Sequence, residues 1–462
     1  MPGSVNTSKT AWIAAFAIGF SMFLPPLAKA ETINQALAAA YNNNPTLNAQ
    51  RAATRAADEN IAIAKSGLRP TITADANIGL TRTRTSSPLG TSRLDLVPRG
   101  FGVTINQTLW DSYLTRNNIN GAIAAVSASQ EALRNAEQNI LFNGASAYLD
   151  VLRDRAILKF RKQTLKFLNE QVRSERARFD VGEATRTDVA QAQASRAAAV
   201  AQAGVASANL QSSEAVYQQI VGKRPGRLSE VKGVQKLVPA SLEAGIVIAV
   251  QEHPAIKSAE HIVDQADFNV RSAESQLLPR IDLQASQRRA KENGQENTTT
   301  TTGSVSAVLT VPIYQGGRTS ATVRQNKEIL GQRQIQVDES VDSVRAAVVS
   351  AYSQYMGART SLIANQEQLK AAKLALDGAV EERKVGQRTT LDVLDTQTQV
   401  LNAQIALENS KRNLKVSGYA ILSAIGRLDA KTLKLHVQRY DPNEHKHAVE
   451  DKWFGLRIPS EE

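Results

Sequence analysis

The stretch FDVGEATRTDV at residues 179–189 interrupts a long segment rich in Ala, Gln and Arg, and RKVGQRTTLDV at residues 383–393 repeats it. In the first copy, Gly182 fits the left-handed position just past a helix C-terminus, where glycine has no steric cost. Thr185 then fits an N-cap, and Asp188 completes a capping box with a short acid. Each stretch therefore predicts a tight turn between two long antiparallel helices. The second copy repeats the arrangement with Gly386, Thr389 and Asp392.

The rest of the chain repeats with these turns. Gly386 follows Gly182 by 204 residues (386−182), and the Asn44-Pro45 pair returns as His253-Pro254 after 209 residues (254−45). Such self-similarity indicates a tandem duplication of about 200 residues. We therefore divide the chain into a signal peptide (1–30), a first repeat (31–221, tip about 181–188), a connecting segment (222–248), a second repeat (249–428, tip about 385–392) and a C-terminal segment (429–462).

Each repeat contains two segments in which apolar and polar residues alternate. Ile72, Ala74, Ala76 and Ile78 share one face, with Thr and acidic or amide residues between them. This pattern is typical of strands, and it fits a membrane-barrel strand with one face toward lipid. A soluble hairpin with one buried face would explain any single strand as well. The four predicted strands lie at about 71–81, 100–110, 280–288 and 303–314.

Between the strands and the turns, apolar residues recur every seven positions, as at Val151, Leu158, Leu165, Val172 and Phe179. This spacing predicts helices that supercoil against neighbours. A helix over residues 111–179 would reach about 100 Å. Four strands cannot close a membrane barrel, since the smallest has about eight, and lipid does not tolerate open edges. Two, three or four chains would pool eight, twelve or sixteen strands, and the pattern does not choose among these numbers.

Composition narrows the class of protein. A charged start, an apolar run and AKA before Glu31 predict a secretory signal cleaved after Ala30. The chain has no cysteine, so stability must come from packing or oligomerisation rather than disulfides. In an exported protein, the net charge of +11 favours anionic lipid or an acidic partner over nucleic acid.

The two turns carry different charges. Arg383 corresponds to Phe179, Arg388 to Ala184 and Asp395 to Gln191 at the offset of 204 (383−179, 388−184, 395−191). Turn chemistry alone accounts for the shared residues, but it does not account for these three. Specific contacts between neighbouring tips would require such differences, and drift between the two repeats would also produce them.

Together these residues resemble the TolC family of bacterial outer-membrane efflux and secretion channels, with VGQRTTLDVLD at 385–395 as the most specific match. The resemblance implies a mainly helical homotrimer whose twelve pooled strands form one transmembrane β-barrel. A coiled-coil α-barrel would continue into the periplasm, girdled by residues 222–248 and the segment after Leu428. The resemblance also implies a function as the exit duct for tripartite efflux or type I secretion. A periplasmic adaptor protein and an inner-membrane pump of the ABC or RND type would open this duct.

The resemblance also assigns roles at the tips. Asp392 and Asp395 match acidic rings of the periplasmic constriction, where repulsion within a trimer would raise the carboxyl pKa values. Arg383 departs from the family, which often has Tyr there, and we expect it to pair with Asp188 or another acid. Residues matched to contacts that hold neighbouring coiled coils closed are Thr187, Asp188 and Arg388. Tip residues matched to adaptor docking are Val181, Gly182, Thr185, Val385, Gly386 and Thr389.

Other classes of protein are less well supported. We expect no enzyme and no cofactor, because the chain lacks cysteine and a phosphate-binding glycine loop. His445 and His447 form a close pair in a charged tail, and we expect solvated side chains there rather than a metal site. A periplasmic coiled-coil adaptor or scaffold without a pore is the alternative function. Residues 82–99 and 288–301 are expected to be external, solvated loops whose arginines could meet lipopolysaccharide phosphates.

Overall fold

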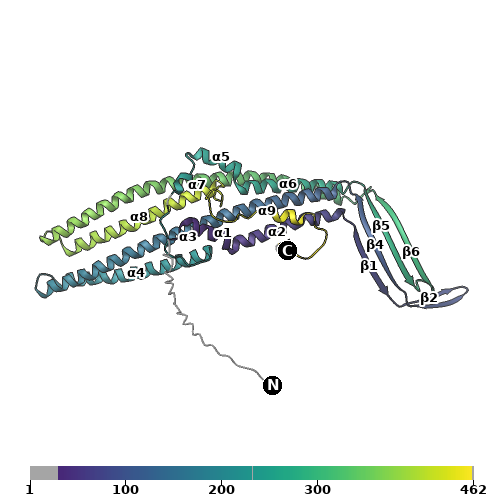
Figure 1. The fold of residues 1–462 in the computed structure, drawn as a ribbon, viewed down its shortest axis with the longest axis horizontal. Coiled ribbons are helices and arrows are strands. Elements are labelled where there is room, and N and C mark those ends of the chain that lie inside the picture. Colours follow the sequence, from purple (N-terminus) through teal and green to yellow (C-terminus); the bar gives the residue numbers. More distant parts are fainter. Residues whose placement is uncertain (1–29, 232, 460–462) are drawn as a thin grey trace, which may run out of the picture.

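The computed structural model describes residues 30–231 and 233–459, so the predicted signal sequence before Ala30 lies outside the described residues. The molecule is elongated, with a sheet at one end and the turns of two helical hairpins at the other (Figure 1). The helices are α1 (Ile33–Asn43), α2 (Pro45–Lys65), α3 (Leu114–Asp180), α4 (Arg186–Val221), α5 (Leu242–Glu252), α6 (Pro254–Ser275), α7 (Arg318–Lys384), α8 (Thr390–Ala424) and α9 (Pro442–Val449). The strands are β1 (Thr71–Ile78), β2 (Thr81–Ser87), β3 (Gly90–Leu96), β4 (Arg99–Trp110), β5 (Arg280–Lys291) and β6 (Thr299–Thr310).

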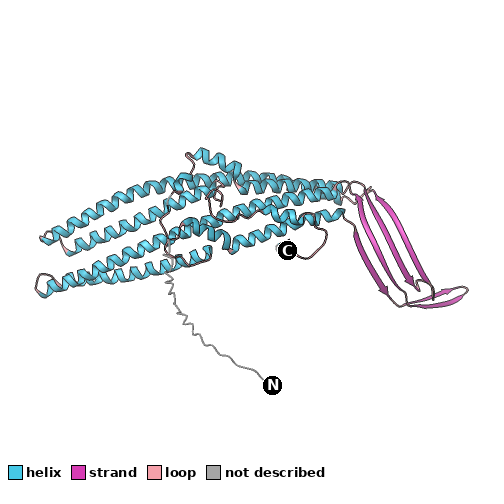
Figure 2. Cartoon of the chain, in the orientation of Figure 1, coloured by secondary structure: helices cyan, strands magenta, loops and turns pink. Residues whose placement is uncertain are grey.

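Two very long helices give the molecule its length. α3 and α7 each contain 67 residues, which corresponds to about 100 Å. Next to the sheet, α3 packs with α2 and α6, and α7 packs with α6. Toward the tips, α3 packs with α4, and α7 packs with α8 (Figure 2). Among the described residues, none of the helices combines the length and apolar character needed to cross a membrane.

The Asn44-Pro45 and His253-Pro254 pairs both start helices of the layer next to the sheet. The Asn44 side chain accepts hydrogen bonds from the backbone N–H groups of Thr46 and Leu47 at 3.0 and 3.2 Å. In the second repeat, His253 Nδ1 accepts one from the N–H of Ala255 at 3.2 Å. Burial lowers the pKa of His253, which favours the neutral imidazole that this cap requires. Both pairs therefore carry out helix capping.

The main sheet is antiparallel, with the order β1-β4-β5-β6. Ile72, Ile105, Ala285 and Val305 stand opposite one another in register across all four strands. The residues one position away on each strand form a polar face, on which Arg288 contacts Asp75 at 2.8 Å. The alternation in the sequence has thus produced a sheet with one apolar and one polar surface, both largely exposed in the single chain.

The region beyond the sheet differs from the expected loops. Residues 82–99 are largely a second hairpin, β2 paired with β3, whose Arg82 and Asp95 form an ion pair at 2.9 Å. The expected loop at 288–301 is also shorter, because β5 continues to Lys291 and β6 begins at Thr299. Both predictions were wrong because these stretches are rich in Thr, Ser and Arg, and their apolar alternation is limited to Leu94 and Leu96 near the end of β3.

The junctions between sheet and long helices show the duplication in the backbone itself. Ser112 and Tyr113, which follow β4, have φ of 54° and 70°. Their counterparts 204 residues later are Gly316 and Gly317, with φ of 63° and 79°. The same left-handed turn therefore leads into α3 and α7, although only the second copy uses residues that adopt it without strain.

The buried core lies midway along the molecule. There, α1, α5 and the segment after α8 wrap the long helices, and the largest wholly buried side chains include Leu37, Tyr148, Tyr217, Ile421 and Leu428. This girdle joins the two repeats, so it fixes how the two hairpin tips lie relative to each other.

Candidate functional site at the hairpin tips

The first tip is a glycine-ended helix followed by a capped restart. Gly182 has φ of 82°, and its N–H donates to the Phe179 carbonyl at 3.0 Å. The Thr185 hydroxyl oxygen accepts from the N–H of Asp188 at 3.2 Å, while the Asp188 carboxylate accepts from the N–H of Thr185 at 2.9 Å. Both halves of the capping box are present, and α4 starts at Arg186 after a turn of five residues, 181–185, from the end of α3.

The second tip has the same geometry. Gly386 has φ of 79°, and its N–H donates to the Arg383 carbonyl at 3.0 Å. Thr389 and Asp392 exchange hydrogen bonds at 3.2 and 2.9 Å. Val181 and Val385, each just before the glycine, are both 71% exposed. The protomer therefore presents two matching turns, each with an uncovered valine.

The capping bonds also set the charge state of two carboxyl groups. The backbone hydrogen bond from Thr185 is the largest cause that holds the pKa of Asp188 below its usual value. The corresponding bond from Thr389 lowers the pKa of Asp392. Within one protomer this direction is opposite to the rise expected in a ring of three chains. Asp395 lies one turn further along α8 and is exposed.

A buried ion pair joins the two hairpins. Arg383 of α7 donates through Nη2 to Oε1 of Glu175 on α3, whose side chain is wholly buried. Gln171 donates to the same oxygen at 2.8 Å, and the Thr390 hydroxyl of α8 donates to it at 3.4 Å. Arg383 is thus paired with an acid other than Asp188, one that the sequence analysis did not identify. The cluster ties α3, α7 and α8 together just inside the tips.

The sequence held a signal for Glu175. It lies three residues after Val172, at the second core position of the same seven-residue repeat, where an apolar residue is the rule. Its counterpart in the second repeat is Ala379 (379−204=175), and the counterpart of Arg383 is Phe179. A charge at a coiled-coil core position requires a partner, but the sequence does not say which helix supplies it.

Arg388 makes a different kind of contact. Its Nε donates to Glu382 at 2.8 Å, and this hydrogen bond is the largest cause that raises the pKa of Arg388. The two side chains are about half exposed, at 50% and 47%. Arg388 therefore pairs within its own hairpin, while Thr187 is exposed on the other hairpin.

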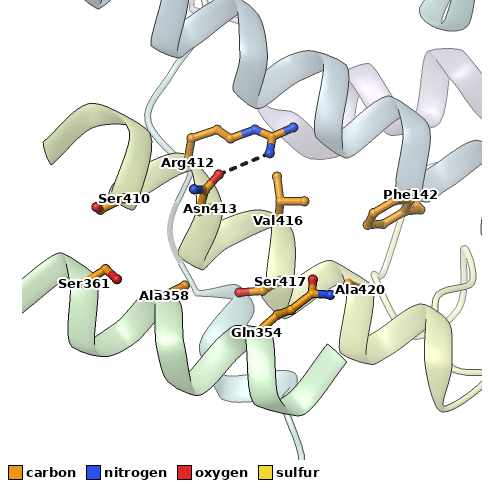
Figure 3. Close-up of a pocket in the computed structure, with 10 residues that line it drawn as sticks. All are labelled: Phe142, Gln354, Ala358, Ser361, Ser410, Arg412, Asn413, Val416, Ser417 and Ala420. Atoms are coloured by element: carbon orange, nitrogen blue, oxygen red, sulfur yellow. Dashed lines mark hydrogen bonds between the residues drawn. The ribbon is translucent and has the colours of Figure 1, made fainter. Parts of the chain in front are cut away.

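A groove between α7 and α8 is the other candidate site (Figure 3). It has a volume of about 440 Å³, and Arg412 and Asn413 lie along it, 3.2 Å apart. The Arg412 guanidinium is already engaged by Asp150 at 2.9 and 3.1 Å and by Ser146 at 2.9 Å. Because its charged group is used to hold α8 against α3, the groove is explained by helix packing.

The sequence predicts two solvated histidines in the tail, but this is wrong for one of them. His445 is largely buried and lies 2.9 Å from the wholly buried Asp58 of α2. His447 is 69% exposed and faces Glu450. Within residues 30–231 and 233–459, no group of three or more potential ligands could hold a metal ion.

Comparison with known proteins accounts for this architecture. The model of the family described as outer membrane efflux protein matches residues 36–223 and 245–427. The chain belongs to this family. It is 45% identical over 447 residues to the outer membrane efflux protein BepC of Brucella suis, covering 96% of both chains. It is 25% identical to TolC of Escherichia coli, covering 88% of this chain and 84% of TolC.

The fold agrees with solved structures of such channels. The outer-membrane channel CmeC of Campylobacter jejuni superposes with a TM-score of 0.74 at 18% identity, covering 91% of this chain and 89% of CmeC. The predicted family resemblance and mainly helical, duplicated fold are confirmed. The chain is an outer-membrane channel protein whose helices extend into the periplasm, and it is not an enzyme. The alternative of a scaffold without a pore is set aside.

Replacing Arg383 by Ala should loosen both tips, because the buried Glu175 carboxylate loses the cation that is hydrogen-bonded to it and keeps only Arg178, 3.9 Å from its Oε2. Removing one partner of a buried pair typically costs about 3 kcal/mol. Hydrogen exchange at residues 171–190 and 383–395 should therefore become much faster. Lys384→Ala, which removes an exposed cation of the same hairpin that pairs with the exposed Glu381, is the matched control and should change the exchange little. Equal rates of hydrogen exchange in the two variants would contradict the inference that the Glu175–Arg383 pair stabilises the tips.

Proposed function

We propose that three copies of this chain form the outer-membrane exit duct of a tripartite efflux system. The observation that carries the proposal is the four-stranded sheet, which has one apolar face, one polar face and two open edges. In lipid, those edges must be paired. Because β1 and β6 run in opposite directions, β6 of one copy can pair antiparallel with β1 of the next, and three copies give a closed set of twelve strands.

The helices support contact between copies. Toward the tips, α3 packs against α4 and α8, and α8 packs against α7, which leaves α4 and α7 at the two sides of the protomer. On α7, Val349, Met356 and Ile363 follow one another at seven-residue spacing and are 42%, 45% and 57% exposed. Such a stripe is what a coiled-coil neighbour would cover. We infer that α7 of one copy packs against α4 of the next.

At the tips, we propose a gate and a docking surface. Asp392 and Asp395 of three copies would line the constriction, and Thr187, Asp188 and Arg388 would contact neighbouring copies. The buried Glu175–Arg383 pair would keep the two hairpins of one protomer moving as a unit. Breaking exposed ion pairs costs little, so binding of an adaptor could shift the balance between closed and open tips.

The proposed partners follow from the same arrangement. The two valine-bearing turns would receive a periplasmic adaptor protein, which connects to an inner-membrane pump of the ABC or RND type. Efflux is the activity that the name of BepC states, and we propose it for this chain; type I secretion would use the same duct.

At the external hairpin, Arg84 of β2 and Arg93 of β3 lie directly opposite each other. We propose that lipopolysaccharide phosphates offset the repulsion between these two arginines.

The trimer is tested by placing charge in the exposed stripe. Met356→Glu/Ile363→Glu would bury six carboxylates among three copies, so we expect the trimer band on mild-detergent gels to be lost. Asp338→Glu/Glu339→Asp, conservative changes at exposed positions of the same helix, should leave the trimer intact. A trimer that forms normally in the first variant would show that α7 does not face a neighbour.

The gate is tested by removing charge while keeping the cap. In Asp392→Asn/Asp395→Asn, the amide oxygen at 392 can still accept from Thr389, but the ring loses its negative charge. Channels in planar bilayers should lose cation selectivity and blockade by polyvalent cations. Asp338→Asn/Glu339→Gln removes the same number of carboxylates away from the tip and should behave as the unmodified channel. Unchanged selectivity in the first variant would exclude these residues from the constriction.

Docking at the tips is tested by cross-linking. Because the chain has no cysteine, Val385→Cys introduces a single thiol at an exposed tip position. A thiol-to-amine cross-linker applied to cells should join it to the adaptor protein. Ile313→Cys, 89% exposed at the sheet end, is the control and should give no such product. Equal yields at the two positions would argue against docking at the tips.

A further inference from the structure

The C-terminal tail follows one stripe of α2. Arg51, Asp58 and Lys65 are spaced seven residues apart, so they share one face of this helix. They contact, in order, the ring of Tyr440 at 5.5 Å, the imidazole of His445 at 2.9 Å and the carboxylate of Asp451 at 2.6 Å. The tail therefore runs parallel to α2, over about 21 Å of helix, in the direction of β1.

The last contact lies at the end of the sheet where β1 begins. Arg69 stands two residues before β1 begins at Thr71, and its Nη1 donates to the Lys452 carbonyl at 2.7 Å. Its guanidinium also lies over the ring of Trp453, 4.8 Å from the centroid. The contacts along α2 thus deliver the tail to the level at which the strands start.

Beyond this point, the tail exposes its largest apolar side chains. Trp453 is 65% exposed, Phe454 is 90% exposed and Leu456 is fully exposed. Basic residues flank them on both sides, at Lys452 and Arg457. Three large apolar groups within four residues are an unusual surface for a water-facing segment.

Other aromatic side chains lie at the same end of the strands. Trp110 ends β4, Tyr113 begins the turn into α3, and Tyr314 follows β6, and they are 44%, 61% and 86% exposed. Aromatic residues at the ends of membrane strands mark the headgroup level of a bilayer. Trp453 lies at the same level as these aromatic residues, although it belongs to the tail and not to the sheet.

We propose that Trp453, Phe454 and Leu456 insert into the phospholipid headgroup layer of the periplasmic leaflet of the outer membrane. Lys452 and Arg457 then lie near the lipid phosphates, as basic residues beside an interfacial anchor do. The inference rests on the proposed placement of the four strands across the membrane. It gives the tail a function of its own: it fixes the height of α2, and with it the base of the sheet, relative to the bilayer.

Tryptophan fluorescence tests the insertion in the full-length protein. The chain has three tryptophans, so Trp12→Phe/Trp110→Phe leaves Trp453 as the single reporter. The protein is reconstituted into vesicles of phosphatidylethanolamine and phosphatidylglycerol with brominated acyl chains. We expect bromolipid to quench Trp453 and aqueous acrylamide to quench it weakly. Adding Arg69→Ala should reduce the bromolipid quenching, because the ring loses the contact that holds it at this level.

Two outcomes would overturn the proposal. Quenching by acrylamide and not by bromolipid would place the tail in water, and quenching by neither would mean that protein, such as a second copy of the chain, covers Trp453. Leu89→Trp in a chain without the other tryptophans is the control, because Leu89 is fully exposed at the turn of the external hairpin. It should respond to acrylamide alone.

A second reporter separates this proposal from the membrane placement on which it rests. In Trp12→Phe/Trp453→Phe, the remaining Trp110 reports on the end of β4. If bromolipid quenches Trp110 and not Trp453, the tail proposal fails and the membrane placement stands. If bromolipid quenches neither, the placement of the strands fails as well.

Discussion

The open edges of the sheet set the conditions for everything else in this molecule. Along their outer edges, β1 and β6 have no neighbouring strand among the described residues, and lipid offers no partner to the backbone N–H and C=O groups there. A single chain cannot satisfy these groups, because four strands are too few to close. The exposed apolar stripe on α7 and the uncovered face of the sheet have the same origin. In the proposed trimer, further copies cover the stripe and pair with the edges, and lipid covers the apolar face.

The two repeats provide a shared frame with different charges. Both hairpins end in a left-handed glycine and restart from a Thr–Asp capping box with nearly identical distances. The cluster around Glu175 and Arg383 has no equivalent in the other half, where Ala379 and Phe179 occupy the corresponding positions. A trimer of such protomers alternates two kinds of tip. This gives a six-tipped end two distinct types of contact, one within each protomer and one between protomers.

Prediction from sequence succeeded where the determinants are local. The tip turns depend on residues within about four positions of one another, and the strand pattern depends on alternation along a single segment. Glu175 and Arg383 lie 208 residues apart, and their pairing depends on how α3 and α7 pack. The β2–β3 hairpin escaped prediction because β2 has no apolar residue and β3 has only Leu94 and Leu96, an alternation too short to predict a strand. His445 escaped because a charged tail gives no sign that a helix 387 residues away holds a buried carboxylate for it.

The sequence by itself therefore determined the duplication, the capped turns, the two-faced strands and the family, since each is encoded in short-range spacing that repeats. Only the tertiary structure decided which distant charges meet: Arg383 with Glu175, and the tail with the stripe on α2. The physical reason is that capping and alternation are properties of one element. An ion pair between elements depends on helix register and on the girdle that aligns the two repeats.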